Sequence, residues 1–343
     1  MNGSEVLARA LRSHGIERVF SHAGGTISHP LHHITRAGIE IVVLPTEAGA
    51  GHAAQAAYRL TGQLQVVLVT SGPGVTNVLT PVADAYFDGD AILVVVGQVE
   101  QSQANTNHHV RQWGFQEVDA LALAAPITKA AIRATRVESL GATVGYLADA
   151  ALGRLVADRR PGPCLLEFPM DVQRQECLSP AVDGRQPWAP IRLSREKVHH
   201  ALEAMMASRR PMILAGRGAV PYWYTLRRFI DRFMPGRWLV ASSLPAVGVV
   251  PTTDPRCVGF IGHTGHPQAN RELASADCLL VLGARLDVRQ VGTASAGWSS
   301  GIRVIRVDCS LQELTYSRMP AWLSFTCDVG RWLQTALEVL DGH

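Results

Sequence analysis

"VVLVTSGPGVTN", residues 66 to 77, leads from an apolar run through a glycine turn into a helical pattern. The apolar run lacks polar alternation, so it predicts a strand buried on both faces, as in a parallel sheet covered by helices. Gly72 and Gly74 let the backbone approach a ligand closely, and Pro73 stiffens the turn. The helix that follows presents free N–H groups in its first turn. The same pattern also occurs as a plain tight turn, and it lacks the Gly-Lys-Ser/Thr of a P-loop.

Short apolar runs alternate with helical patterns along the whole chain. Helical patterns include Ser4–His14, Gly49–Thr61 and Val75–Phe87. Strands are predicted at Arg18–Phe20, Glu40–Leu44, Gln65–Thr70, Ala91–Val96, Cys164–Phe168, Met212–Ala215, Trp238–Ala241, Cys278–Leu282 and Val304–Val307. The sequence therefore predicts an α/β protein with two doubly wound parallel-sheet domains, 1–175 and 191–343, joined by a proline-containing linker at 176–190.

The bulk composition is that of a globular protein. Hydrophobic residues make up 47% and charged residues 18% of the 343 residues, which excludes a disordered chain. The net charge of +3 is too small to favour nucleic acid or an acidic membrane as a partner. The six cysteines show no CxxC spacing, no apolar run reaches the ~20 residues of a membrane span, and the N-terminus resembles an amphipathic helix. We therefore expect a soluble, cytoplasmic protein with free thiols.

One carboxylate, Glu47, stands between the strand predicted at Glu40–Leu44 and an alanine-rich helix, in "LPTEAGAGHAAQAAYRLTG" (44–62). A carboxylate at a helix start is favourable with the helix dipole. Glu47 alone therefore does not indicate a function.

An ordered set of motifs carries a more specific resemblance. Glu47 is followed by "TSGPGVTN" (70–77), "GQV" (97–99), "GFQEVD" (114–119) and "RPGPCLLEFPMDV" (160–172). In this order they resemble the pyrimidine-binding domain of thiamine-diphosphate enzymes, most closely the catalytic subunit of acetolactate (acetohydroxyacid) synthase. "RRPMILAGRGA" (209–219), "GARLDVRQVG" (283–292) and "VIRVDCS" (304–310) are similar to the central domain of the same family.

The resemblance implies roles for individual residues in the first domain. Glu47 matches the catalytic glutamate that bonds the pyrimidine ring of the cofactor, a role that needs a carboxyl whose proton affinity is raised, as burial would do. Gln116 matches a glutamine that, in the family, lies on the side of the site that faces the cofactor and the substrate. The other matching positions around the cofactor are Gly24, Gly25, Pro73 and Asn77.

This chain departs from the family pattern at several positions. Thr46 stands where the family usually has His, and Gln55-Ala56 where it usually has Asp-Gly. A longer insert, "EQSQANTNHHVRQWG" (100–114), contains His108 and His109. These resemble the catalytic acid/base histidines of 2-oxo-acid decarboxylases in the superfamily, and a His there can shuttle protons. The alternative is a solvated loop with two incidental histidines.

In the acetolactate synthase family the central domain binds FAD. Glycines permit close approach to a pyrophosphate, and an acidic residue at a strand end can hold a ribose hydroxyl. The matching positions are Gly216, Arg217, Gly218, Ser243, Leu244, Gly265, Gly283, Ala284, Arg285, Asp287, Arg289 and Asp308. Because "GHTGH" (262–266) replaces the family's Met-His-Gly-Thr, a domain that keeps the fold and binds nothing remains an alternative.

Full-length relatives have a third domain whose Gly-Asp-Gly and Asn-Asn motifs hold Mg²⁺ and the diphosphate. Neither string occurs in this chain, so no metal site of that kind is expected in it. We expect a separate subunit to supply this domain, with a homodimer of this chain inside a heterotetramer. A truncated enzyme is an alternative.

The expected activity is decarboxylation of a small 2-oxo acid and ligation of the resulting acyl carbanion to a carbonyl acceptor. Two alternatives remain open: a decarboxylase subunit, and a non-catalytic FAD- or nucleotide-binding regulatory homologue.

Overall fold

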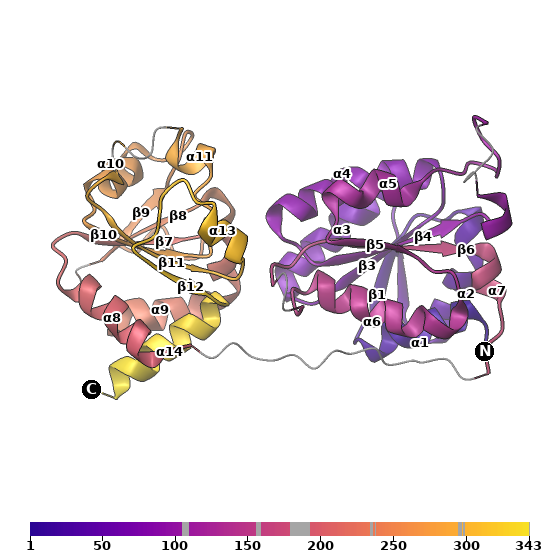
Figure 1. The fold of residues 1–343 in the computed structure, drawn as a ribbon, viewed down its shortest axis with the longest axis horizontal. Coiled ribbons are helices and arrows are strands. Elements are labelled where there is room, and N and C mark those ends of the chain that lie inside the picture. Colours follow the sequence, from indigo (N-terminus) through magenta and orange to yellow (C-terminus); the bar gives the residue numbers. More distant parts are fainter. Residues whose placement is uncertain are drawn as a thin grey trace. The chain divides into compact units, whose positions relative to one another are not determined.

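The computed structural model describes residues 1–104, 110–155, 159–178, 193–233, 236, 238–293, 297 and 299–342. The chain divides into two compact units, Met1–Ala189 and Pro190–His343, and each contains one parallel six-stranded sheet (Figure 1). This is the predicted fold class of two doubly wound α/β domains. Most of the predicted linker, 176–190, lies outside the described residues.

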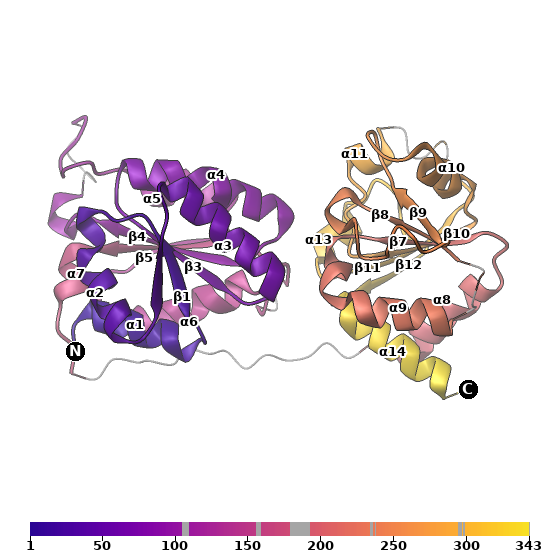
Figure 2. The same cartoon turned by 180° about the vertical axis from the view of Figure 1, so that it is seen from behind.

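The sheet of the N-terminal unit has the strand order β2-β1-β3-β4-β6-β5. Its strands are β1 (Arg18–Ser21), β2 (Glu40–Val43), β3 (Gln65–Val69), β4 (Ile92–Gln98), β5 (Ala130–Arg133) and β6 (Cys164–Pro169). Its helices are α1 (Gly3–Ser13), α2 (Ser28–Arg36), α3 (Glu47–Thr61), α4 (Pro73–Asp88), α5 (Ala120–Ala124), α6 (Leu140–Ala151) and α7 (Met170–Arg174). Helices α3, α4 and α5 cover one face of the sheet, and α1 and α6 cover the other (Figures 1 and 2).

Alternate residues of the central strands supply two separate hydrophobic cores. Val66 and Leu68 of β3 pack with α1 and α6, whereas Val67 and Val69 pack with α3 and α4. All five residues of β3 are buried, because both faces of a parallel sheet are covered by helices. This explains the continuous apolar run that predicted the strand.

The C-terminal unit has the order β12-β11-β10-β7-β8-β9, which is the dinucleotide-binding topology of an open α/β sheet. Its strands are β7 (Pro211–Ala215), β8 (Leu239–Ser242), β9 (Cys257–Phe260), β10 (Cys278–Leu282), β11 (Arg303–Asp308) and β12 (Leu323–Thr326). Its helices are α8 (Arg195–Met206), α9 (Trp223–Arg232), α10 (Pro267–Ser275), α11 (Val288–Val291), α13 (Leu311–Thr315) and α14 (Val329–Asp341). Helices α8, α9 and α14 lie on one face, and α10 and α11 on the other (Figures 1 and 2).

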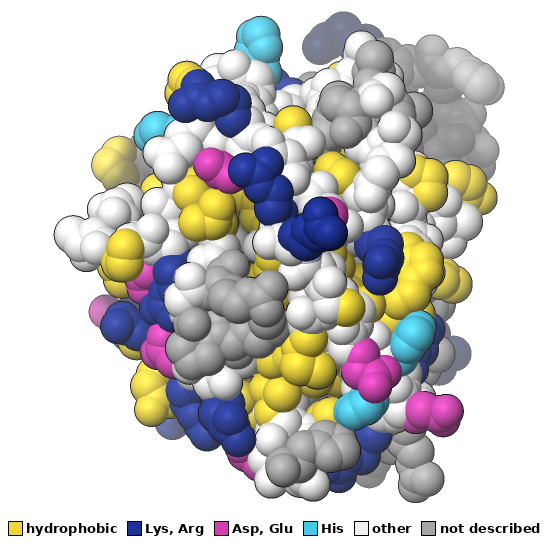
Figure 3. Space-filling view, turned by 90° about the vertical axis from the view of Figure 1, so that its left-hand side faces the viewer, with side chains coloured by type: hydrophobic (Ala, Val, Ile, Leu, Met, Phe, Trp, Pro, Cys, Tyr) yellow, Lys and Arg dark blue, Asp and Glu magenta, His cyan; other side chains and the backbone are white. Residues whose placement is uncertain are grey.

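Lysine and arginine side chains are dispersed among hydrophobic and uncharged side chains on the face shown in Figure 3. The six cysteines are free, and four of them are buried. Within the described residues, no helix has both the length and the apolar character needed to cross a membrane.

Candidate cofactor site

The loops that carry the predicted site residues of the N-terminal unit leave the same edge of its sheet. Because the strands are parallel, the segments after β1, β2 and β3 all begin at the carboxyl edge. Strand β1 lies between β2 and β3, so the connections after β1 and β3 run in opposite directions. Open α/β sheets bind ligands at such a topological switch point.

Glu47 is the first residue of α3, and Asn77 lies in the second turn of α4. The Thr46 hydroxyl caps α3 by accepting the N–H of Gly49 at 3.0 Å. The Nδ2 atom of Asn77 donates to Oε2 of Glu47 across 2.7 Å. The Glu47 side chain is half-buried, so its carboxylate is oriented by Asn77 while the residue stays partly accessible.

Gly74 leaves space beside the second carboxylate oxygen. A Cβ at residue 74 would lie 3.4 Å from Oε1 of Glu47 and 2.8 Å from Cγ2 of Thr70. Only glycine fits there without displacing Thr70. The arrangement of one oxygen bonded to Asn77 and one bordered by a glycine fits a carboxylate that binds a ring nitrogen of a ligand.

Gln116 lies against the glycine turn that precedes α4. Gly72 has φ +60°, and a Cβ there would lie 2.5 Å from the carbonyl oxygen of Gln116. Gln116 itself has φ +52°, which is uncommon for a residue other than glycine. Pro73 begins α4 and is exposed, as is the Gln116 side chain. The structure therefore brings these two predicted site residues together through the Gly72 turn.

The Gly24-Gly25 loop after β1 is fixed against the end of β3. The hydroxyl groups of Thr26 and Thr70 are 2.8 Å apart, and the N–H of Ser71 donates to the Thr26 hydroxyl at 3.2 Å. A Cβ at Gly24 would overlap Thr70, whereas Gly25 faces open space. Position 24 therefore requires glycine because its backbone lies directly against Thr70. Gly25 has open space beside it, where a ligand could lie.

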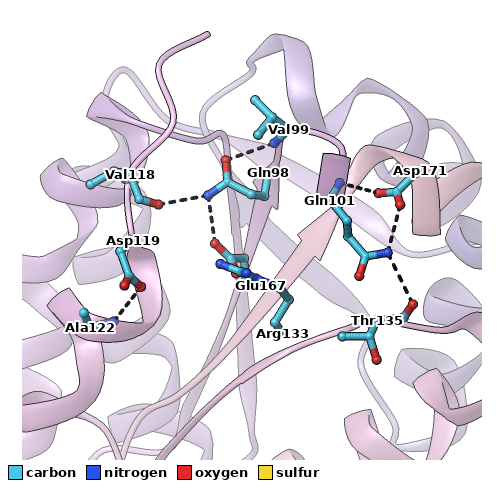
Figure 4. A network of polar contacts seen from close by, with 10 residues as sticks. All are labelled: Gln98, Val99, Gln101, Val118, Asp119, Ala122, Arg133, Thr135, Glu167 and Asp171. Carbon is cyan, nitrogen blue, oxygen red and sulfur yellow. Dashed lines mark hydrogen bonds and ion pairs between the residues drawn. The ribbon is translucent and has the colours of Figure 1, made fainter. Parts of the chain in front are cut away.

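Behind these loops lies a buried polar network of Gln98 and Glu167, which belong to two of the sequence motifs but had no predicted role (Figure 4). The Nε2 atom of Gln98 donates to Oε1 of Glu167 at 2.8 Å and to the carbonyl of Val118 at 3.0 Å. Its Oε1 atom accepts the N–H of Val99 at 2.9 Å. Arg133 pairs with the other oxygen of Glu167, whose side chain is fully buried. Since Val118 is two residues from Gln116, the network anchors the loop that carries Gln116.

A second, more exposed contact in Figure 4 fixes the start of the insert. Gln101 donates its backbone N–H and its Nε2 to Asp171, at 3.2 and 2.8 Å, and Nε2 also reaches the Thr135 carbonyl at 3.4 Å. The start of the insert is thereby tied to the start of α7, the short helix that follows β6. His108 and His109 lie outside the described residues.

The departure at Gln55 has a structural reason. Gln55 is buried and donates Nε2 to Oδ2 of Asp90 at 3.0 Å, and Arg59 donates Nε to the same oxygen at 2.7 Å. An acidic residue at position 55 would place a second carboxylate against fully buried Asp90. Glutamine donates a hydrogen bond there instead.

The predicted glycines of the C-terminal unit meet where β7 and β10 end. The N–H of Gly218 donates to the carbonyl of Gly283 at 3.1 Å. A Cβ at Gly216 would lie 2.1 Å from that carbonyl oxygen. Strands β7 and β10 are neighbours at the switch point of this sheet. Packing of one loop against the other therefore requires Gly216 whether or not a ligand binds.

Arg306 stabilises the loop of Ala284 and Arg285 by hydrogen bonds to its carbonyl groups. It is 1% exposed, and its guanidinium donates to the carbonyls of Ala284, Arg285 and Glu313 at 3.1, 3.3 and 2.7 Å. Burial lowers the pKa of Arg306. No sequence pattern indicates this role, because a basic residue in a strand does not show which carbonyls its side chain will contact.

Asp308 ends β11 two residues after Arg306, on the same face of the strand. Burial raises the pKa of Asp308 to about 6. The N–H of Ser310 donates to its carboxylate at 2.9 Å, which lowers the pKa but does not offset the effect of burial. The side chain is 7% exposed. A buried carboxyl at the carboxyl edge of this topology suits a hydroxyl donor such as a ribose.

The remaining predicted residues of this unit also lie on carboxyl-edge loops. Ser243 is buried and donates its N–H to the carbonyl of Ala215, whereas Leu244 is 62% exposed. Asp287 caps α11 by accepting the N–H groups of Arg289 and Gln290. The Arg289 carbonyl accepts the N–H of His263 at 2.8 Å, and Gly265 turns back on Gly262. Arg217 is half-buried between Gly216 and Gly218.

Two family descriptions match the two units. Residues 1–123 match "Thiamine pyrophosphate enzyme, N-terminal TPP binding domain", and residues 198–336 match "Thiamine pyrophosphate enzyme, central domain". The chain belongs to the thiamine pyrophosphate enzyme family, of which it contains the N-terminal and central domains.

Acetolactate synthases are among the relatives that the chain matches. The chain is 29% identical to the acetolactate synthase large subunit of Haemophilus influenzae, over 90% of this chain and 52% of that protein. It is 30% identical to acetolactate synthase 2 of Nicotiana tabacum, over 99% and 50%, and to the isozyme 2 large subunit of Escherichia coli, over 93% and 56%. The chain thus spans about half the length of the curated relatives that it matches.

Proposed function

We propose that this chain supplies the pyrimidine-binding half of a thiamine-diphosphate site, with Glu47 as the residue that holds and activates the pyrimidine ring. The main observation that supports this proposal is the position of the Glu47 carboxylate. Its Oε2 accepts a hydrogen bond from Nδ2 of Asn77 at 2.7 Å, and its Oε1 lies beside Gly74. Pro73, Gln116 and the Gly24-Gly25 loop would form the rest of the wall around the cofactor. Bound thiamine diphosphate would supply the electron sink for breaking a bond next to a carbonyl.

The proposed reaction is decarboxylation of a small 2-oxo acid followed by ligation of the acyl fragment to a carbonyl acceptor. The names of the three relatives described above support this, since each is an acetolactate synthase or a subunit of one. In the proposed site Glu47 would exchange a proton with the pyrimidine ring, and the loops of Gly25 and Gln116 would orient the substrate. Simple decarboxylation, with His108 or His109 as proton donor, is the second candidate.

We further propose that the diphosphate and Mg²⁺ are bound outside these 343 residues, by a separate subunit. The chain has no Gly-Asp-Gly or Asn-Asn string to hold them, and Mg²⁺ is bound through carboxylate and phosphate oxygens. A two-fold symmetric dimer of this chain that binds two copies of that subunit would be a heterotetramer. The free cysteines fit the reducing cytoplasm as its location.

For the C-terminal unit we propose FAD binding across the switch point between β7 and β10. The loops of Gly216–Gly218 and Gly283–Arg285 would approach the pyrophosphate, and Asp308 would hold a ribose hydroxyl. The test is release of flavin from the purified chain on heating, read by its visible absorbance. An equimolar yield is expected, and a chain that is folded, flavin-free and unable to take up added FAD would contradict the proposal.

The catalytic proposal is tested on the complex purified from its source cells. Native mass spectrometry is expected to find a second chain of roughly 150–200 residues that carries Gly-Asp-Gly and Asn-Asn. Glu47→Gln should lower turnover of a 2-oxo acid by about 10²–10⁴-fold and weaken the binding of thiamine diphosphate measured by calorimetry.

The matched control is Glu40→Gln, which removes an exposed carboxylate from the neighbouring strand β2. Wild-type turnover by Glu47→Gln would refute the site. A homo-oligomer without any diphosphate-binding chain would favour a regulatory homologue or a longer form of this chain.

A further inference from the structure

The C-terminal unit contains a cavity of about 330 Å³. It lies between α9 and the connection from β8 to β9. Three residues of α9 and six residues between Gly248 and Arg256 line it. None of them belongs to the predicted FAD-binding residues, and its volume is in the range that holds one small molecule.

One wall of the cavity is a single face of α9. Trp223, Arg227 and Ile230 are four and three residues apart, a spacing that places them in line on one side of a helix. The Trp223 side chain is 55% exposed, whereas Ile230 is 2% exposed. This wall therefore has an accessible aromatic ring at Trp223 and a buried apolar side chain at Ile230.

The opposite wall is apolar and is formed by the residues that follow the turn at Gly248. Val249 and Val250 are 7% and 9% exposed and belong to the core of this unit, and Pro251 follows them. Gly248 has φ +93°, which glycine adopts readily. A flat, apolar group could pack between this wall and Trp223.

The charged residues of the cavity are not equally available. Arg256 donates Nη2 and Nε to Asp254 at 2.7 and 2.9 Å, and Nη1 to Asp231 at 2.7 Å. The hydrogen bond from Arg256 lowers the pKa of Asp254 to about 2, so this pair stays ionised and engaged. Arg256 is thus fixed by two carboxylates.

Arg227 is held far more loosely than Arg256. Its nearest ion-pair contact joins Nε to Oδ2 of Asp231 at 3.8 Å, and both side chains are about half exposed, 53% and 51%. An exposed contact of this length contributes little free energy. The guanidinium of Arg227 is therefore available to a ligand carboxylate, which it can bind through two parallel hydrogen bonds.

We propose that this cavity binds a small aromatic carboxylate, with the ring between Trp223 and the Val249–Pro251 wall and the carboxylate on Arg227. A single available cation fits a monoanion, and an exposed indole favours a planar ring. The proposal is independent of thiamine diphosphate and of FAD, because the cavity shares no residue with either proposed site.

The test is calorimetric titration of the full chain with naphthoate, and in parallel with the uncharged naphthamide. Saturable binding of naphthoate is expected, with naphthamide at least about tenfold weaker because it cannot form the charge-assisted contact. Arg227→Gln should weaken naphthoate binding about tenfold, and Trp223→Leu about fivefold.

The chain offers matched controls next to both positions. Arg228 and Tyr224 are exposed neighbours on α9 that do not line the cavity, so Arg228→Gln and Tyr224→Leu should bind naphthoate as the wild type does. No saturable binding at millimolar naphthoate, equal binding of naphthamide, or equal losses in the Arg227 and Arg228 variants would each overturn the proposal. Circular dichroism of each variant establishes that it is folded.

Discussion

Asn77 and Glu47, which lie 30 residues apart in the sequence, are joined by a 2.7 Å hydrogen bond from Nδ2 to Oε2. The bond connects the start of α4 with the start of α3, two helices that leave the same edge of the sheet. It occupies one oxygen of the carboxylate and leaves the other beside Gly74. The orientation of the proposed catalytic group therefore depends on an amide donor in a neighbouring motif.

Replacing that donor by an acceptor should disable the proposed site without unfolding it. Asn77→Asp places two carboxylates within contact distance, and like charges at this distance repel. We expect kcat/KM of the assembled complex to fall by about 10–100-fold, since Glu47 loses its fixed orientation. The control is Thr80→Asp, which adds the same charge at an exposed position one turn further along α4. Equal activities of the two variants would contradict the role of Asn77.

The turn at Gly72 should tolerate no side chain. Gly72 has φ +60°, and a Cβ there would lie 2.5 Å from the Gln116 carbonyl, so Gly72→Ala combines backbone strain with a clash. We expect a loss of about 2–4 kcal/mol in unfolding free energy. Gly62→Ala is the matched control, because Gly62 has φ +68° but no neighbour within 4 Å, and it should cost about 1 kcal/mol. Hydrogen exchange of the β3 and β4 amides in urea measures both losses, and similar costs for the two variants would disprove the contact with Gln116.

The buried strands could be predicted from the sequence, whereas three of the edge strands could not. Strands β3, β4 and β10 are buried along their whole length, so their apolar runs are continuous. The missed strands β5, β9 and β12 are four residues long, lie at sheet edges and are only partly buried. Each has one unpaired edge and mostly half-buried residues, so these strands lack the long apolar run of a central strand.

The candidate site shows the same division. Glu47, Asn77 and the Gly72 turn follow strand ends, and parallel strands bring such positions to one edge. The network of Gln98, Glu167 and Arg133 was not predicted, because pairing over 69 residues between Gln98 and Glu167 leaves no local pattern. A buried polar residue reveals its partner only in the folded chain.

Loss of the Gln98 side chain should expose that network's contribution to the Gln116 loop. Gln98→Leu removes the donor to Oε1 of Glu167 and to the Val118 carbonyl, and an unsatisfied buried group costs about 1–3 kcal/mol. We expect this loss in stability together with faster hydrogen exchange at residues 114–119. Gln101→Leu removes an exposed glutamine that also donates to a carboxylate and should cost less than about 1 kcal/mol. Unchanged exchange at 114–119 in folded Gln98→Leu would show that the loop is held by other contacts.

Asp308 should make the stability of the C-terminal unit depend on pH. Its pKa is raised by burial from 3.8 to about 6, so the folded state binds the proton more tightly than the unfolded state. The stabilisation that Asp308 contributes is complete below pH 4 and is lost as the pH rises through 6. Asp308→Asn keeps an acceptor for the Ser310 N–H but cannot ionise. It should match the wild type near pH 4 and exceed it by roughly 2–3 kcal/mol at pH 8, at 1.36 kcal/mol per pKa unit. Urea unfolding followed by the fluorescence of buried Trp238 and Trp332 measures the difference, and a gap that is constant with pH would mean that Asp308 is not the titrating group.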